Sequence, residues 1–236
     1  MGRQPPRPAG DSPTAVPSDA DPQRYRLGMR VTGAHAADNL YDRVARMLRT
    51  LNVGTLLDMG CADGVLRDAL SPSGPWTVGL DASAALPRSH PPPVVRGDAV
   101  RLPFVDGAFD AVTALNVLYH LPAPVSALRE ARRVLRDGGH LLVATIARDD
   151  SPELAPYWRR PATTFDAEDA PDLLAQVFTD VEVYPWDARL VTLPTAAAIH
   201  DYLVGRQAPA AAARAAARAL AVPLAVTKRG ALLVAR

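Results

Sequence analysis

Hydrophobic positions recur at two different spacings along the chain. Between residues 25 and 51 the apolar side chains fall three or four positions apart, which predicts an amphipathic helix lying on an apolar surface. From residue 55 the pattern changes to short apolar runs typical of buried strands, at 55–59, 76–80, 94–95, 109–115 and 140–146. Since helical segments lie between several of these runs, the pattern predicts an α/β fold whose parallel sheet is covered on both faces.

The second half of the chain continues this alternation after one interruption. The helix that begins at Pro122 is expected to end at the Asp137-Gly138-Gly139 turn, because glycine commonly terminates helices in the left-handed conformation. Residues 148–169 hold three prolines and three aromatic residues, and we interpret them as an ordered insertion over one edge of the sheet. Further helices are predicted at 171–178, 195–204 and 208–220, and strands at 181–184, 224–228 and 231–235.

Proline dominates the beginning of the chain. The prolines at positions 5, 6, 8, 13, 17 and 22 disfavour a helix or a paired strand, so residues 1–21 are predicted to be a disordered arm. A polyproline II docking motif is the alternative interpretation. We expect a helical cap at 22–52, followed by one large domain at 53–236 that includes the insertion at 148–169.

Composition narrows the possible functions. With 26 basic and 25 acidic residues, the chain has no single-sign field that would favour nucleic acid or an anionic membrane. Its single cysteine, Cys61, excludes an internal disulfide framework and a cysteine-cluster metal site. No apolar run approaches the roughly 18 residues of a membrane span, and no secretion signal is recognisable. We therefore expect a cytoplasmic protein that neither inserts into a membrane nor binds nucleic acid.

The segment after the first strand is the most informative. Small residues at Gly60, Ala62 and Gly64 precede a helix, so the backbone can approach a ligand closely and the helix start favours polar ligand groups. The dinucleotide fingerprint G-x-G-x-x-G does not fit, because Val65 stands where its third glycine is needed. Asp58, inside the end of the strand, is unfavourable beside a pyrophosphate and suits a ligand with a cationic amine.

Acidic residues also follow the next two strands. Asp81 ends the second strand, at close to the roughly 20-residue distance from a glycine turn that is typical of a ribose-binding acid. The alternative is that Asp81 only caps the helix that would start there. After the third strand, Asp98 can accept from the adenine amine while the Ala99 N–H meets a ring nitrogen. The successive strand ends thus converge on a ligand with amine, ribose and adenine parts.

Together these segments resemble the class I S-adenosylmethionine-dependent methyltransferases, in the ubiquinone/menaquinone-biosynthesis branch with a type 11 methyltransferase domain. The resemblance is strong over 56–146, and its matching positions are 58–64, Asp81, Asp98-Ala99, 109–112 and 135–139. It implies a Rossmann-like, doubly wound, mainly parallel seven-stranded sheet with an N-terminal helical cap and an insertion after the fifth strand. One departure is Ala62, where the family usually has glycine; alanine is tolerable there if its φ is negative.

The resemblance also implies roles for individual residues around S-adenosylmethionine, with S-adenosylhomocysteine as the product. The methionine part is wrapped by Gly60, Cys61, Ala62 and Gly64, with Asp58 near its amine. The ribose is held by Asp81 with Ala82, and the adenine by Asp98 with Ala99. Leu115 and Asn116, at the end of the fourth strand, offer backbone groups to the methionine amine. No metal is required, and the five scattered histidines suggest none.

The acceptor side is less defined. His120 is the candidate general base, although a structural role in ordering its loop is the stronger interpretation. In the N-terminal segment, Tyr25 is placed to cover the methyl site and Arg30 to pair with the methionine carboxylate. The acceptor pocket is expected to be lined by the N-terminal helix, the insertion and residues 186–193, whose aromatic side chains favour a small aromatic or polyketide-like metabolite.

Other aspects of function remain open at this stage. O-, N- and C-methylation are all compatible with the chain, and we expect a monomer or a homodimer acting on a small-molecule acceptor. A cofactor-binding protein without catalysis, acting through a partner protein, is a second class. A nicotinamide-dependent oxidoreductase is a third, and both Val65 and Asp58 argue against it.

Overall fold

The computed structural model describes residues 21–70, 72–86 and 89–236, so the arm predicted before residue 21 lies outside the described residues. Helix α2 (Pro22–His35) is the first element. Pro22, the first residue of the predicted helical cap, occupies the first turn of α2, where proline is favourable because its position there needs no backbone N–H. Asp21 caps this helix by accepting from the Arg24 backbone N–H at 2.9 Å.

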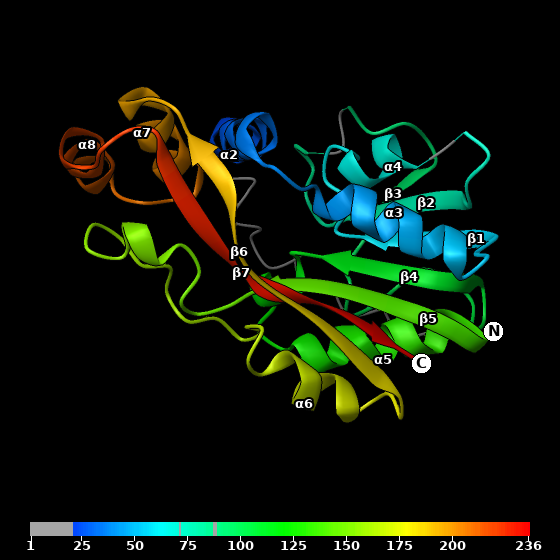
Figure 1. The fold of residues 1–236 in the computed structure, drawn as a ribbon. Helices are drawn as coiled ribbons and strands as arrows, with labels where there is room; N and C mark the ends of the chain where they lie inside the picture. Colours follow the sequence, from blue (N-terminus) through cyan, green and yellow to red (C-terminus); the bar gives the residue numbers. More distant parts are fainter. Residues whose placement is uncertain (1–20, 71, 87–88) are drawn as a thin grey trace, which may run out of the picture.

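Seven strands form one sheet in the order β3-β2-β1-β4-β5-β7-β6 (Figure 1). The first five pair in parallel, while β7 runs antiparallel to both β5 and β6. Their bounds are Thr55–Met59 (β1), Trp76–Asp81 (β2), Val94–Arg96 (β3), Phe109–Leu115 (β4), Leu135–Ile146 (β5), Val181–Leu193 (β6) and Leu224–Ala235 (β7). This confirms the doubly wound α/β fold. Because strand order reverses between β1 and β4, the carboxyl ends of these strands flank the crevice where such sheets bind ligands.

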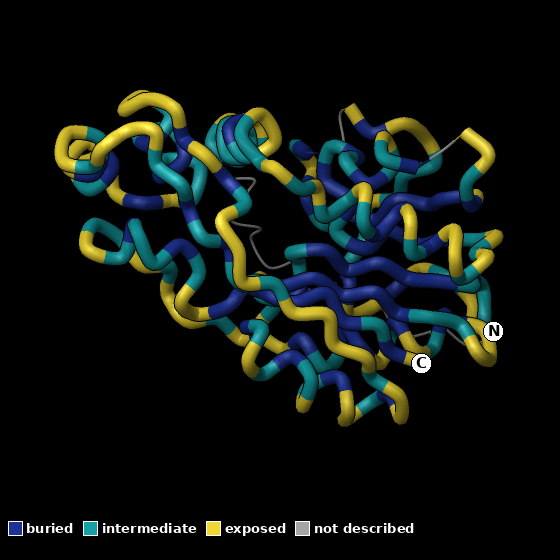
Figure 2. The backbone as a smooth tube through the Cα atoms, viewed as in Figure 1, coloured by how far each residue is buried: buried dark blue, intermediate teal, exposed yellow. Residues whose placement is uncertain are grey.

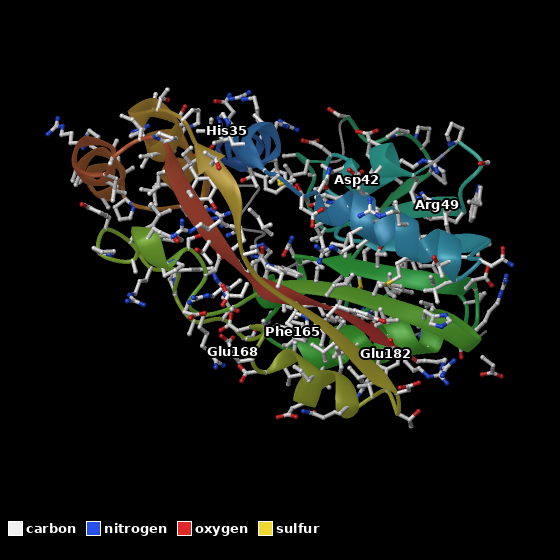
Figure 3. The ribbon with its side chains drawn as sticks, viewed as in Figure 1. His35, Asp42, Arg49, Phe165, Glu168 and Glu182 are labelled. Carbon is white, nitrogen blue, oxygen red and sulfur yellow. The ribbon has the colours of Figure 1, made fainter. Side chains whose placement is uncertain are left out.

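Helices cover both faces of the sheet. Helices α3 (Leu40–Thr50) and α4 (Val65–Ala69) lie on one face, and α5 (Pro124–Val134) and α6 (Ala170–Ala175) lie on the other (Figure 1). Alternate residues of β4 follow this division: Ala111 packs in the cluster with α3, and Val112 in the cluster with α5. The strands form the buried centre between the helical layers (Figure 2). Phe165 of the insertion is buried on the α5–α6 side, whereas Asp42 lies on α3 (Figure 3).

A second apolar cluster lies beyond the carboxyl ends of the parallel strands. We call it the cap; it consists of α2, the short helix η3 (Pro152–Leu154), α7 (Ala196–Gly205), α8 (Ala210–Ala219) and the adjoining ends of β6 and β7. Helices α2 and α7 meet at two glycines, where a Cβ on Gly28 would lie 3.0 Å from the Gly205 carbonyl oxygen. The predicted N-terminal helical segment is therefore divided, with α2 in the cap and α3 on the sheet.

Three expected boundaries differ from the structure. Helix α5 ends at Val134 and not at the glycine pair, because Leu135 already pairs with Phe109 and the glycines fall inside β5. Residues 186–193, expected to line a pocket, belong to the 13-residue strand β6. The two C-terminal strand segments form one continuous strand, β7, because β6 pairs with it along its whole length. In the described part of the chain, no helix is long and apolar enough to cross a membrane.

Candidate functional site

The turn after β1 is built around left-handed backbone. Gly60 has φ +80° and Gly64 has φ +90°, conformations that favour glycine because they place a Cβ against the backbone. The Gly60 and Cys61 N–H groups donate to the Leu80 carbonyl at 2.7 and 3.1 Å, which ties the turn to β2. Burial raises the pKa of the Cys61 thiol, so this residue contributes its backbone and a neutral side chain.

Close packing also requires the two glycines. A Cβ on Gly60 would lie 2.7 Å from the Cβ of Val117, which follows β4 across the crevice. A Cβ on Gly64 would lie 3.0 Å from the ring of His90. The His90 ring is buried beneath the turn, where its Nδ1 lies 2.6 Å from the Pro91 carbonyl oxygen. The turn therefore has no room for side chains between β1 and its neighbours.

Ala62 departs from the expectation stated for it. Its φ is +45°, whereas tolerance of alanine was argued for a negative φ. The left-handed conformation brings the alanine Cβ close to the following carbonyl. Its N–H donates to Asp81 Oδ2 at 2.9 Å, and this bond holds the residue in its strained conformation.

Replacing Ala62 with glycine should therefore stabilise the ligand-free protein. We expect a gain of about 0.5–1 kcal/mol, because relief of left-handed strain exceeds the extra chain entropy of glycine. Urea denaturation measures this change. The matched control is Ala215→Gly, at an exposed position inside α8, which should lose about 1 kcal/mol. Equal losses in both variants would contradict the strain at residue 62.

Asp58 is a buried carboxylate at the crevice end of β1. Its Oδ1 accepts from the Thr113 hydroxyl at 2.8 Å, and burial raises the pKa of Asp58 to about 6. The Thr113 hydrogen bond opposes that rise, while the negative charge of Asp81 adds to it. Across the crevice Asn116 has φ +56°, and its buried Oδ1 has no hydrogen-bond partner. Two acceptor groups at the ends of neighbouring strands suit a ligand group that is cationic and rich in N–H donors.

Asp81 lies at the end of β2, where its side chain holds the surrounding loops. Its Oδ2 accepts from the Ala62 N–H at 2.9 Å and its Oδ1 from the Ser83 N–H at 2.8 Å. The second bond is a local turn contact, and residues 82–86 form no helix that Asp81 could cap. Ala82 is half-buried beside it. The structure thus places Asp81 and Ala82 next to the glycine turn, with the carboxylate facing the crevice loop.

The remaining predicted cofactor residues follow β3 and β4. Asp98 is half-buried, and its Oδ1 accepts from the Val100 N–H at 3.0 Å. Ala99 and Leu115 are buried at 7% exposure each, so any contribution to a ligand comes from their backbone. The Asn116 backbone N–H already donates to the Ala144 carbonyl at 2.8 Å, so this residue offers oxygen atoms to a ligand. Asp110, by contrast, accepts from the Thr55 N–H at the opposite end of the sheet.

Helix α2 brings different residues to the crevice than the sequence indicated. Arg26 reaches the glycine turn as a two-point pair, with Nε 2.7 Å from Asp63 Oδ2 and Nη2 3.1 Å from Asp63 Oδ1. Arg30, the predicted cofactor contact, lies one turn further along α2 and is exposed. Burial raises the pKa of Tyr25, and the negative charges of Asp63, Asp81 and Asp58 raise it further, so Tyr25 lies within electrostatic range of these carboxylates.

Aromatic side chains gather where β4 ends. Burial raises the pKa of both Tyr41 and Tyr119, and these phenols interact electrostatically with each other and with Tyr25. The His120 ring packs on Tyr119 with centroids 4.4 Å apart, although His120 as a whole is exposed. Partial burial of the ring lowers the pKa of His120, and the Arg160 guanidinium lowers it further. Its imidazole is therefore neutral near pH 7.

A surface depression also occurs elsewhere on the molecule. It has a volume of about 460 Å³ and lies between α3 and the outer ends of β6 and β7. None of the predicted site residues lines it, and its acidic and basic side chains come mostly from exposed positions. We therefore place the functional site at the carboxyl ends of β1, β2 and β4, where the buried polar atoms are found.

Comparisons with known proteins identify the family of this chain. The family model for the methyltransferase domain matches residues 33–177. The demethylmenaquinone methyltransferase of Mycolicibacterium vanbaalenii is 30% identical over 193 residues, which cover 78% of this chain and 84% of the relative. That of Mycolicibacterium paratuberculosis is 31% identical, over 73% of this chain and 79% of the relative.

Solved structures share the fold at lower identity. A possible histamine N-methyltransferase from Thermotoga maritima superposes with a TM-score of 0.61 at 16% identity, covering 92% of this chain and 97% of the other. The cyclase SpnF superposes with a TM-score of 0.60 at 20% identity, covering 93% and 96%. The chain belongs to the class I S-adenosylmethionine-dependent methyltransferases, in the ubiquinone- and menaquinone-like branch. It is an enzyme that transfers a methyl group.

Proposed function

We propose that the enzyme binds S-adenosylmethionine in the crevice between β1 and β4 and methylates a small aromatic or polyketide-like metabolite. The observation that carries the cofactor assignment is the pair of acceptor groups, Asp58 and the unpartnered Asn116 Oδ1. This pair of acceptors suits the ammonium of the cofactor's methionine part. The crowded glycine turn fits the same group, since a chain without side chains allows close approach.

Each part of the crevice has a distinct task in this proposal. Asp58 and Asn116 bind the ammonium, Asp81 accepts from the ribose hydroxyls, and Asp98 with the Ala99 N–H holds the adenine. Bound S-adenosylmethionine supplies an activated methyl group on a sulfonium, so the protein contributes chiefly alignment. The neutral phenols of Tyr25 and Tyr119 cover the crevice and exclude water.

The acceptor assignment rests on the cap. Tyr157 and Trp158 of the insertion pack against its apolar cluster, and the insertion continues to the loop after β4, where Thr164 donates to the Leu121 carbonyl at 2.6 Å. Aromatic side chains beside an otherwise polar crevice favour a flat, partly apolar acceptor. The relatives named demethylmenaquinone methyltransferase support a cyclic acceptor of this general kind. O-, N- and C-methylation all use the same alignment.

Calorimetric titration with S-adenosylmethionine, S-adenosylhomocysteine and NAD tests the cofactor assignment. We expect both adenosyl compounds to bind and NAD to leave no measurable heat. A methyl-transfer assay with radiolabelled donor against aromatic and polyketide acceptors then tests turnover. Binding without turnover on every acceptor would favour a protein acting through a partner. Binding of NAD alone would contradict the proposal.

His120→Gln separates the two roles considered for this residue. We expect turnover within about tenfold of the wild type, a barrier change near 1.4 kcal/mol, because methyl transfer depends mainly on alignment. Glutamine replaces the hydrogen-bonding capacity of the imidazole but cannot act as a base near neutral pH. A loss beyond a hundredfold, with unchanged S-adenosylmethionine affinity, would identify His120 as the general base.

A further inference from the structure

Two arginines from distant parts of the chain lie beside Tyr119. Arg160 comes from the insertion, and its guanidinium carbon lies 5.5 Å from the centroid of the Tyr119 ring. Arg206 follows α7, and its guanidinium carbon lies 4.2 Å from the centroid of the Tyr202 ring. The positive charges of both arginines act on the Tyr119 hydroxyl and oppose the rise in its pKa that burial causes. The two guanidinium groups therefore share one neighbourhood at the end of β4.

Each arginine is held at one end and leaves a buried donor unused. Arg160 Nη2 donates to Asp166 Oδ1 at 2.6 Å, and Arg206 Nη1 lies 3.7 Å from Asp150 Oδ2. The Nε atoms of both arginines are buried and have no hydrogen-bond partner within the described residues. An unsatisfied donor on a buried cation is costly. The buried Tyr202 hydroxyl lies beside Arg206 and can accept from it, so Arg160 Nε is the donor that an incoming hydrogen-bond acceptor would satisfy.

The ion group around Arg206 carries a surplus of positive charge. Asp150 pairs with Arg206 and also with Lys228, the only lysine of the chain, which is 9% exposed. One carboxylate thus serves two cations. These cations lower the pKa of Asp150 against the opposing effect of its burial, so the carboxylate is ionised and cannot accept a further proton near neutral pH. An anionic ligand would balance the remaining charge.

The same neighbourhood adjoins the proposed cofactor crevice. Tyr119 interacts electrostatically with Tyr25 and Tyr41, and both of these also interact with Asp58. The tyrosines therefore lie between the acidic residues of the crevice and the two arginines, Arg160 and Arg206. Because their phenols are neutral, they can donate hydrogen bonds on either side. A molecule placed against Tyr119 meets the cofactor side at one end and the arginines at the other.

We propose that Arg160 and Arg206 recognise the acceptor and that the acceptor carries a carboxylate, which these two side chains bind. The planar guanidinium fork matches carboxylate oxygens and remains charged at all relevant pH values. This inference rests on the proposed function for the position of the methyl donor. In the reaction, an electron pair of the acceptor forms the bond to the methyl carbon while the carbon–sulfur bond breaks, which leaves a neutral sulfide. When the attacking atom is a hydroxyl, an amine or an enol carbon, it also releases one proton, which passes to solvent.

The test compares acids with their neutral amides. Three acids are titrated calorimetrically into the full chain: salicylate, anthranilate and 1-hydroxy-2-naphthoate. The primary amide of each acid is titrated in the same way as its neutral control. Every titration is done with and without S-adenosylhomocysteine. We expect at least one acid to bind the wild type at least tenfold more tightly than its amide. If no acid of the three binds more tightly than its amide, the proposal is overturned, and this comparison needs no variant.

Variants then assign the preference to the two arginines. Arg160→Gln and Arg206→Gln should each reduce the acid-over-amide preference at least tenfold. Arg159→Gln, at the exposed neighbouring position, should keep it. Affinity for S-adenosylhomocysteine should stay within threefold in all three folded variants, and circular dichroism checks folding. If the preference survives both substitutions, the arginines are not the recognition pair. The wild type could also prefer the acids over the amides and yet fail to bind S-adenosylhomocysteine. That result would contradict the cofactor assignment and leave the recognition of acids by the arginines intact.

Discussion

Gly60→Ala should lower the affinity for S-adenosylmethionine by about a hundredfold or more, which corresponds to about 2.8 kcal/mol. The new Cβ would lie 2.7 Å from the Val117 Cβ, an atom fixed to the backbone that cannot move by a rotamer change. The turn and the segment after β4 must therefore separate, and Asp58 and Asn116 lose their common geometry. Calorimetric titration measures the affinity, and circular dichroism checks that the variant folds.

Gly138→Ala is the matched control for this prediction. Gly138 also has a left-handed φ, +73°, but a Cβ there would have no heavy atom within 4 Å. Both variants thus carry a similar backbone cost, on the order of 1 kcal/mol, and only Gly60→Ala adds the collision. Gly138→Ala should leave the affinity for S-adenosylmethionine unchanged. Comparable losses of affinity in the two variants would show that backbone strain, and not the crevice geometry, causes the effect.

Asp58→Asn should weaken S-adenosylmethionine binding on the order of a hundredfold, because the ammonium loses a charged acceptor worth about 3 kcal/mol. The wild type should also lose affinity as the pH falls through about 6, since burial raises the pKa of Asp58 to about 6 and only the carboxylate attracts the cation. The variant should lack this pH dependence. Titrations across that range measure both effects. Asp42→Asn, at an exposed position of α3, should retain the wild-type behaviour.

The same substitution should have the opposite effect on stability. A carboxyl group whose pKa is raised in the folded state stabilises the protein below its unfolded pKa, and this contribution is lost as the pH rises through about 6. At pH 7 the buried charge thus costs the ligand-free protein up to about 3 kcal/mol. Asp58→Asn removes this cost, so urea denaturation should show a gain in stability at pH 7 that disappears near pH 4. A variant less stable than wild type at pH 7 would contradict the assigned shift.

Many residues of the crevice can be predicted from the sequence, because residues that follow parallel strands lie at the same edge of the sheet. Short apolar runs located β1, β2 and β4, and the polar residues directly after them meet at one edge whatever the surrounding details. For this reason the sequence alone predicts that Asp58, Asp81 and Asn116 lie at the same edge of the sheet. The small residues at 60, 62 and 64 likewise indicated the turn through their size alone.

Other features depend on contacts that no local pattern records. Arg26 and Arg30 lie one turn apart on α2, and only the docking of that helix decides which of them reaches the glycine turn. The sign of φ at Ala62 follows from its bond to Asp81, which is 19 positions away. Arg160 and Arg206 approach Tyr119 only because the insertion and α7 fold beside it. A helical pattern also could not show that pairing with Phe109 ends α5 at Val134.

The contact between Gly28 and Gly205 connects the helix that carries Arg26 with the helix that precedes Arg206. Gly28 lies two residues after Arg26, which holds the glycine turn, and Gly205 directly precedes Arg206. Because the two backbones touch without intervening side chains, a displacement of α2 toward α7 at this point must displace α7 as well. Ordering of α2 over a bound methyl donor therefore also restrains the arginine beside Tyr119. In the proposed function, any tightening of acceptor binding by the bound donor is matched by an equal tightening of donor binding by the acceptor, because such coupling is reciprocal.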